Sequence, residues 1–299
     1  MKMALHATRD TEDPAAFFAN APAGPLELTV LVDNKADGAR LAAEHGFSLL
    51  LGLAGKQILF DTGQGPALRH NTSALEISFH ALDALALSHG HYDHTGGTPE
   101  VLRQNPNVRI FAHPDLFTPR YSQRNAPPQP IGIPQAANEA LGGQLSNITW
   151  TPAPTRITDG VWVTGAIPRI NDFEDTGGPF FLDPECRRPD PIEGDQALWI
   201  HTPKGIVVIL GCAHAGVVNT LDHIARLTGS NQFHAVIGGM HLVNADQNRL
   251  LRTLEALKRY RIKILAPCHC TGQQAQDFLK ETFKDQYVDI QAGTRIAIC

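Results

Sequence analysis

The segment from Ser88 to His94 reads Ser-His-Gly-His-Tyr-Asp-His and places three histidines and one aspartate within six residues. It directly follows a short apolar run at 84–87, which is typical of a buried strand. Because side chains alternate along extended backbone, His89 and His91 should project from the same face. A bend before His94 would then set Asp93 and His94 opposite that pair. A polar turn with incidental histidines is the alternative, and it does not explain this density of ligands.

Two facing pairs of ligands suit a binuclear centre, in which two divalent metal ions lie about 3.5 Å apart. Imidazole and carboxylate ligands favour Zn²⁺, with Mn or Fe as alternatives. A bound metal brings the pKa of its water near neutrality, so that a metal-bound hydroxide can attack an ester. We therefore assign Asp93 a catalytic role as well as a role as ligand.

The same pattern of an apolar strand followed by glycine and histidine recurs at three later places. The segments are Gly-Cys-Ala-His-Ala-Gly at 211–216, Gly-Gly-Met-His at 238–241 and Pro-Cys-His-Cys-Thr-Gly at 267–272. Ligands at the carboxyl ends of neighbouring strands can converge on one crevice. His214, His241 and His269 are thus candidates to complete a site begun by Ser88 to His94.

Other functional classes find no support in the sequence. It contains neither a Gly-x-Ser-x-Gly nucleophile elbow nor a Gly-Lys-Ser/Thr phosphate loop. The net charge is −5 and no long basic run is present, so nucleic acid is not an expected partner. We also expect no secretory signal and no membrane span. Five cysteines without regular spacing predict free thiols and a cytoplasmic location.

Short apolar runs dominate the first half of the chain, and strands alternate with helices in the last third. This order predicts an α/β fold in which two sheets pack together with helices outside, a four-layered αββα sandwich. We expect strands at 26–32, 47–53, 57–60, 84–87, 108–112, around 149, and at 161–164, 197–201, 206–210, 234–237 and 263–266. We expect helices at 65–75, 98–104, 217–227, 247–260 and 273–283.

Three segments fall outside this regular pattern. Residues 1–25 are rich in Ala and Pro and are interpreted as an N-terminal extension to a single domain at 26–299. Residues 114–145 are rich in Pro, Gln, Asn and Gly and are interpreted as an insertion that leaves the core. Residues 167–193 form a second insertion, of a length typical of lids and binding loops.

The sequence resembles the metallo-β-lactamase-fold superfamily, whose signature is His89-x-His91-x-Asp93-His94. It is similar in particular to the branch of 7,8-dihydropterin-6-methyl-4-(β-D-ribofuranosyl)-aminobenzene-5'-phosphate synthase-like proteins. The resemblance covers nearly all of residues 26–296. The closer match rests on the motifs at 164–169, 195–198, 211–216, 238–242 and 267–272.

The resemblance implies a division of the ligands between two metals. His89 and His91 would bind the first metal, with His214 as third ligand. The second metal would be bound by Asp93, His94 and His269.

Most members of the superfamily have a bridging aspartate where this chain has Cys212. A Cys212 thiolate could bridge or ligate a metal, which would favour Zn²⁺ or Fe. Alternatively Cys212 is a small buried residue and only His214 reaches the metal. Cys268 and Cys270 have the spacing of a metal-binding pair, yet the resemblance indicates His269 alone.

The remaining candidates have a structural and a functional interpretation each. His241 either hydrogen-bonds within the crevice wall or, as we prefer to direct metal ligation, contacts substrate or supports the ligands. The leaving group could be protonated by a histidine such as His241 or by water. Asp61 is either a turn cap or, by resemblance, a support for the ligands. Arg169 and Glu174 are either solvated loop charges, or Arg169 grips an anionic group of the substrate with its guanidinium fork.

Together these features predict a binuclear metallohydrolase that acts on a small-molecule ester. Phosphodiesters and phosphotriesters are favoured, with lactones and carboxylic esters as other substrates. The alternatives are a pterin-condensing synthase and a metal-binding sensor without catalysis. A redox role with a flavin partner is not expected, because nothing resembles an attached flavin domain. A homo-oligomer is compatible with the sequence.

Overall fold

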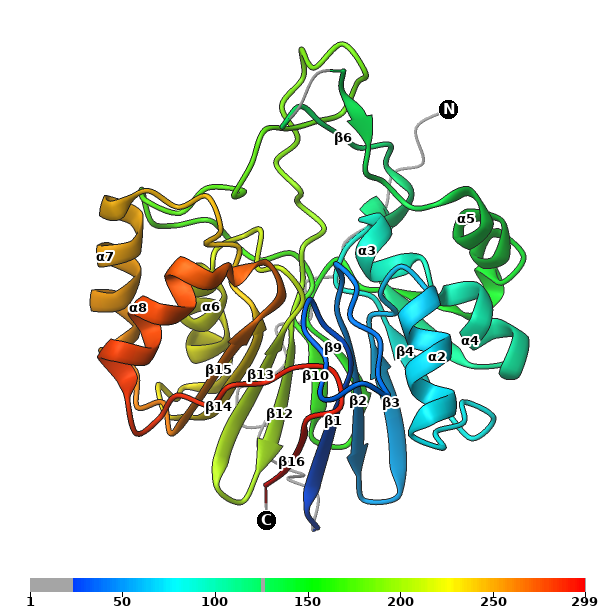
Figure 1. Cartoon of the computed structure of the whole chain (residues 1–299), viewed down its shortest axis with the longest axis horizontal. Coiled ribbons are helices and arrows are strands. Elements are labelled where there is room, and N and C mark those ends of the chain that lie inside the picture. Colours follow the sequence, from blue (N-terminus) through cyan, green and yellow to red (C-terminus); the bar gives the residue numbers. More distant parts are fainter. Residues whose placement is uncertain (1–23, 125–126, 299) are drawn as a thin grey trace.

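The computed structural model of the chain describes residues 24–124 and 127–298. The predicted N-terminal extension at 1–25 lies outside the described residues except for its last two. Two sheets face each other through apolar side chains, and helices cover their outer faces (Figure 1).

The first sheet has seven strands in the order β16-β1-β2-β3-β4-β5-β8. The strands β1, β2 and β3 form antiparallel neighbours, whereas β3, β4, β5 and β8 run parallel. The bounds are β1 Leu26–Val32, β2 Ser48–Leu53, β3 Lys56–Phe60, β4 Ala84–Ala86, β5 Arg109–Ala112, β8 Ile148–Trp150 and β16 Arg295–Ile298.

The second sheet has six strands in the order β15-β14-β13-β12-β10-β9. Its strands β13, β14 and β15 are parallel, so their carboxyl ends meet at one edge. The bounds are β9 Thr155–Thr158, β10 Val161–Val163, β12 Leu198–Thr202, β13 Gly205–Leu210, β14 Phe233–Gly239 and β15 Ile264–Cys268.

Helices pack on the outer face of each sheet. On the first sheet lie α2 (Pro66–Ala74), α4 (Thr98–Gln104) and α5 (Gln135–Gly142), and on the second α6 (Val217–Thr228), α7 (Gln247–Leu257) and α8 (Gln273–Phe283) (Figure 1). One apolar core fills the space between the sheets, and one lies under each helical layer. The predicted αββα sandwich is confirmed.

A small third sheet stands above this sandwich, at the same end as the carboxyl ends of the parallel strands (Figure 1). It pairs β6 (Tyr121–Ser122) with β7 (Gln129–Pro130) and β11 (Phe180–Phe181), so both predicted insertions contribute to it. The first insertion also returns to the core, because Leu141 of α5 is fully buried under the first sheet. Among the residues described, no helix has the length and apolarity needed to cross a membrane.

Candidate metal centre

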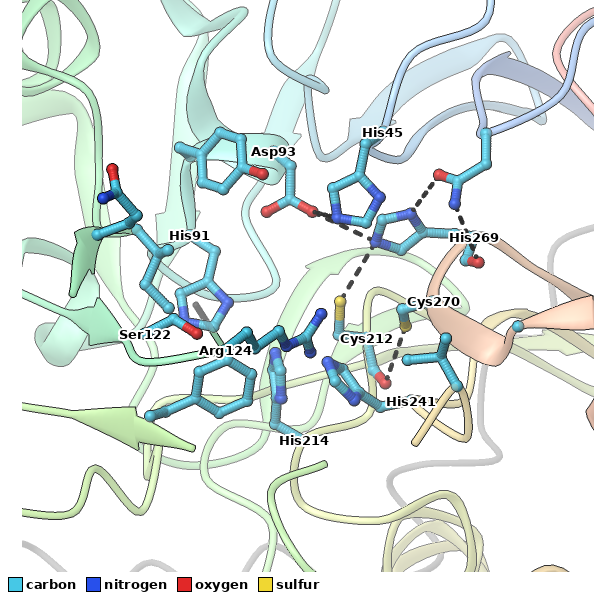
Figure 2. Close-up of a pocket in the computed structure, with 17 residues that line it drawn as sticks. His45, His91, Asp93, Ser122, Arg124, Cys212, His214, His241, His269 and Cys270 are labelled. Carbon is cyan, nitrogen blue, oxygen red and sulfur yellow. Dashed lines mark hydrogen bonds and ion pairs between the residues drawn. The ribbon is translucent and has the colours of Figure 1, made fainter. Parts of the chain in front are cut away.

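Four of the histidines predicted to do chemistry line a cavity of about 430 Å³, and His89 and His94 lie beside them. The four are His91, His214, His241 and His269. The cavity lies where strands of both sheets end, under the small third sheet, and Figure 2 shows the side chains that turn into it. Both insertions supply parts of its wall. The lining residues are Asn34, His45, His91, Tyr92, Asp93, Ser122, Arg124, Gln129, Ile131, Phe180, Cys212, His214, His241, Val243, His269, Cys270 and Gly272.

The first set of donor atoms consists of His89, His91 and His214. Their ligand atoms all lie within 4.8 Å of one another, and all three residues are buried. His89 Nε2 is 2.9 Å from His91 Nδ1, as expected for two side chains on one face of an extended backbone. His214 joins them from the loop after β13. We call these three residues the first donor set.

The second set consists of Asp93, His94 and His269. Asp93 and His94 lie in the short helix α3 (Tyr92–Thr95), which supplies the bend expected after His91. His94 Nε2 lies 3.2 Å from His269 Nε2. Asp93 Oδ2 lies 3.7 Å from His94 Nε2 and 3.5 Å from His269 Nε2. Three donor atoms from two distant parts of the chain thus converge. We call these residues the second donor set.

Cys212 lies between the two donor sets. Its Sγ is 3.1 Å from His94 Nε2 and 3.4 Å from His269 Nε2. It also lies within 4.8 Å of ligand atoms of His89 and of His214. A tetrahedral zinc site with ordinary Zn–N and Zn–S bonds has neighbouring donors roughly 3.3–3.7 Å apart. The triangle of Cys212, His94 and His269 is close to that size.

The chemistry of these donors fits divalent metal ions. Burial, followed by the nearby imidazoles, lowers the pKa of His89 and of His214, and both are therefore neutral, as a ligand must be. The Nε2 atoms of His91 and His214 are buried and have no hydrogen-bond partner in the described structure. A metal ion would satisfy such atoms.

His94 differs from the other histidines. Burial alone would lower its pKa, but the carboxylates of Asp93 and Asp61 raise it to about 9. The same imidazole, together with His45, holds the pKa of Asp93 well below its ordinary value despite burial. The protein therefore stabilises positive charge at this point, and a divalent cation would supply that charge.

Asp61 orients one histidine of each donor set, His94 directly and His89 through Ser88. It follows β3, and its carboxylate accepts hydrogen bonds from the Ser88 amide and the Ser88 hydroxyl, each at 2.7 Å. His94 Nδ1 lies 2.7 Å from Asp61 Oδ2, and the Ser88 hydroxyl lies 2.8 Å from His89 Nδ1. The interpretation of Asp61 as a turn cap is therefore wrong, since its carboxylate orients ligands of both sets.

We expect Asp61→Asn to weaken metal binding about 10–100-fold, the usual effect of removing a partner of metal-binding histidines. The amide would leave the His94 ring without its carboxylate acceptor. Competition with a chromogenic chelator would measure the change. Asp83→Asn is the control, because the Asp83 carboxylate pairs with Lys56 away from the donor sets. This variant should leave metal affinity unchanged.

His269 is positioned by the loop after β1. Asn34 Oδ1 lies 3.0 Å from His269 Nδ1, and Asp33 accepts the His269 amide at 2.8 Å. Cys268 and Cys270 flank His269 but differ in position. Cys268 belongs to the core between the sheets, whereas the Cys270 thiol faces the cavity and donates to the Cys212 carbonyl at 3.6 Å. The two thiols therefore do not face the same space as a metal-binding pair would.

His241 lies on the far side of Cys212 and His214, with ring centroids of His241 and His214 4.4 Å apart. Its Nδ1 is buried and has no hydrogen-bond partner within the described residues. Burial, followed by the charges of Arg124 and Arg249, lowers its pKa to about 3. A neutral imidazole is suited to a hydrogen bond with substrate. That His241 protonates the leaving group stays a prediction.

Several side chains that line the cavity belong to no motif of the sequence. His45 is half-exposed, and its Nε2 lies 3.2 Å from Asp93 Oδ2. Arg124, with Ser122 nearby, extends into the cavity from the first insertion, and its guanidinium lies 5.6 Å from the centroid of the Phe180 ring (Figure 2). The isolated position of His45 and Arg124 in loops without a motif explains why they were missed.

Arg169 does not reach the cavity. Its guanidinium donates to the carbonyls of His214, at 2.6 Å, and Pro191, so it joins the two ends of the second insertion to the loop after β13. Glu174 is not a solvated charge either. Its carboxylate accepts the amides of Val218 and Asn219 at the beginning of α6. In this arrangement Arg124, not Arg169, is the guanidinium that lines the cavity, so the expected grip of Arg169 on substrate stays a prediction without support from the geometry.

We expect Arg169→Gln to lower the melting temperature and speed proteolysis within 167–193, because two carbonyls lose a charged donor. The Michaelis constant should change less than threefold. In Arg124→Gln the Michaelis constant should rise about tenfold, because the cavity loses its guanidinium, and the melting temperature should stay unchanged. Steady-state kinetics and limited proteolysis on the two variants distinguish a residue that holds the loop from one that contacts substrate.

The sequence matches the family model of the metallo-beta-lactamase superfamily over residues 42–269. The αββα fold and the donor sets described above agree with that match, and the chain belongs to this superfamily. Among curated proteins it is similar to the 7,8-dihydropterin-6-methyl-4-(beta-D-ribofuranosyl)-aminobenzene-5'-phosphate synthase of Methanocaldococcus jannaschii, with 31% identity over 84% of this chain and 89% of that protein. An uncharacterized protein of the same organism is 32% identical over 83% of this chain and 91% of its own length.

Solved structures agree with this assignment. Tm1679, a metal-dependent hydrolase of the beta-lactamase superfamily, superposes with a TM-score of 0.77 at 28% identity, covering 91% of this chain and 99% of that one. Igni18, a metallo hydrolase of Ignicoccus hospitalis, shares the fold at a TM-score of 0.55 and 12% identity, covering 92% of this chain and 99% of its own.

Proposed function

We propose that this protein is a metal-dependent hydrolase of small-molecule esters, with phosphoesters as the favoured class. The observation that carries the proposal is the pair of donor sets, which meet at Cys212 beside the cavity. His89, His91 and His214 would hold one divalent ion, and Asp93, His94 and His269 the other. Zn²⁺ is the favoured metal, because neutral imidazoles and a thiol are its usual ligands.

When bound, the metal ions would supply Lewis acidity and bring the pKa of a water close to neutrality. The chain itself supplies the positioning. Asp61 and Ser88 fix the orientation of His94 and His89. Phe180 and Ile131 line the cavity with apolar surface and limit the access of bulk water.

The preference for phosphoesters rests on the charge of the cavity wall. Arg124 extends into the cavity, and a guanidinium binds phosphoryl oxygens with two parallel hydrogen bonds. The name of the similar synthase from Methanocaldococcus jannaschii also specifies a phosphate. A neutral lactone or carboxylic ester would leave the Arg124 charge without a partner.

The direct test is the hydrolysis of a panel of chromogenic phosphodiesters, phosphotriesters, carboxylic esters and lactones by zinc-loaded protein. We expect turnover of the phosphodiesters, which is lost on chelation and restored by Zn²⁺. A fully metal-loaded protein that is inert on the whole panel would contradict the proposal.

A pterin-condensing synthase is the second candidate, favoured by the 31% identity to the named synthase. The same cavity would then bind a pterin and a ribosyl phosphate of an aromatic amine. Fluorescence titration with a pterin distinguishes the two candidates. Micromolar binding of the pterin, together with an inert ester panel, would favour the synthase.

A further inference from the structure

A second cavity, of about 510 Å³, adjoins the metal cavity. Arg124 lines both cavities, so it forms part of the wall between them. Other lining residues come from the second insertion, from the loop after β14 and from the beginning of α7. They are Asp175, Thr176, Gly177, Gly178, Pro179, Asn244 and Arg249.

The segment 175–179 separates the second cavity from the donor sets and contacts them directly. The Thr176 carbonyl lies 2.8 Å from His214 Nδ1. Gly177 is packed so closely against the His241 ring that a Cβ at this position would overlap it, and its φ of +84° also favours glycine. A substrate that reaches from the donor sets into the second cavity would thus cross only the segment 175–179.

The charges in the second cavity favour an anion. Two guanidinium groups, of Arg124 and Arg249, face one carboxylate, that of Asp175. Arg249 pairs with Asp175 through Nη1, yet its side chain is only 6% exposed and its Nε–H has no hydrogen-bond partner in the described residues. A buried N–H without an acceptor is rare in proteins, and a small shift of the side chain would let a ligand oxygen satisfy it.

We propose that the second cavity binds a second, non-reacting phosphate group of the substrate. This inference rests on the proposed function, because the ester bond to be cleaved would lie at the donor sets. A phosphate offers several acceptor oxygens to the two guanidinium groups, and the cavity is large enough for a sugar-sized group as well. The substrate class is therefore an elongated phosphoester that carries a phosphate at a distance from the bond that is cleaved.

A matched pair of nucleotides tests the proposal by binding alone. Thymidine 3',5'-bisphosphate and thymidine 5'-monophosphate differ by one phosphate, and their affinities for the zinc-loaded protein can be measured by calorimetry. We expect the bisphosphate to bind at least about tenfold more tightly. Equal affinities of the two nucleotides would overturn the proposal.

Two variants locate the effect. Arg249→Gln should reduce the preference for the bisphosphate to less than threefold, and Arg124→Gln, at an exposed position, should do so without a risk to folding. Arg252→Gln is the matched control, since Arg252 lies one turn further along α7 and pairs with Asp172 outside the cavity. An unchanged preference in both cavity variants would contradict the assignment of the site.

The p-nitrophenyl 5'-esters of the same two nucleotides separate this inference from the proposed function. A binding preference for the bisphosphate without hydrolysis of either ester would support the phosphate site and contradict the hydrolase. Hydrolysis of both esters with equal kcat/KM, and equal binding of the nucleotides, would support the hydrolase and contradict the phosphate site.

Discussion

Asp93→Ala should lower kcat on a chromogenic phosphodiester by on the order of a thousandfold, comparable to the loss of a principal electrostatic group in other active sites. The reason is the position of its carboxylate, which lies 3.5–3.7 Å from the imidazoles of His269 and His94 and 3.2 Å from His45. Without it, the imidazoles of His269 and His45 lose their carboxylate partner, and His94 keeps only that of Asp61. We also expect the second metal ion to be lost, which mass spectrometry under native conditions would detect.

The matched control is Asp159→Ala, which removes an exposed carboxylate on the turn between β9 and β10. It should change neither kcat nor metal content. If Asp93→Ala altered only the melting temperature and left turnover intact, the donor sets would be structural. The sensor without catalysis, one of the alternatives raised by the sequence, would then be favoured.

Cys212→Ser is expected to have the second largest effect, a fall in kcat of about 10–100-fold. Burial raises the pKa of the Cys212 thiol, so a bound metal ion would be what deprotonates it. Serine would replace that sulfur ligand by a hydroxyl that binds Zn²⁺ weakly. Cobalt-substituted protein gives a readout that is independent of activity. The wild type should show a near-ultraviolet band from thiolate-to-cobalt charge transfer, and the variant should lack it.

Cys186→Ser serves as control, because Cys186 lies in the second insertion outside the metal cavity. Cys212→Asp introduces the aspartate expected here from the resemblance to the superfamily, and it should keep two metal ions while shifting the preference from Zn²⁺ towards Mn²⁺. A wild-type cobalt spectrum without the charge-transfer band would mean that Cys212 is a small buried residue and not a ligand.

The regular elements follow from patterns that are local in the sequence. The expected strand at 26–32 and the helices at 98–104 and 273–283 coincide with β1, α4 and α8. The strand β16 was missed, because its sequence Arg-Ile-Ala-Ile at a sheet edge alternates too briefly to be distinguished from a tail. The helix α5 was missed because the prolines and glycines around it mask a helix of eight residues.

The donor sets were accessible to sequence reasoning because histidines follow strands whose carboxyl ends must meet. The contacts that loop side chains make could not be predicted from the sequence in the same way. Whether a guanidinium such as Arg169 or Arg124 reaches a cavity depends on how two insertions pack against each other, and no local pattern encodes that packing. Arg120 illustrates the point, since it forms a buried ion pair with Asp190, 70 residues away.

Backbone strain is a second feature that the sequence does not reveal. Asp61, His241 and His269 have φ values of +59°, +44° and +49°, in a region that costs non-glycine residues on the order of 1–3 kcal/mol each. All three side chains face the donor sets or support them. Positive φ also occurs away from the site, at Ala54, Glu76, Cys186 and Ile192, but at these three residues it sets the orientation of a ligand or its partner.

The central claim is that two metal ions are held by the first and second donor sets with Cys212 between them. Anomalous diffraction from crystals of the purified protein, measured on both sides of the zinc absorption edge, tests it most directly. We predict two peaks roughly 3.5–4 Å apart, one among His89, His91 and His214 and the other among Asp93, His94 and His269. A single peak, or two peaks that both lie away from these donor atoms, would contradict the account.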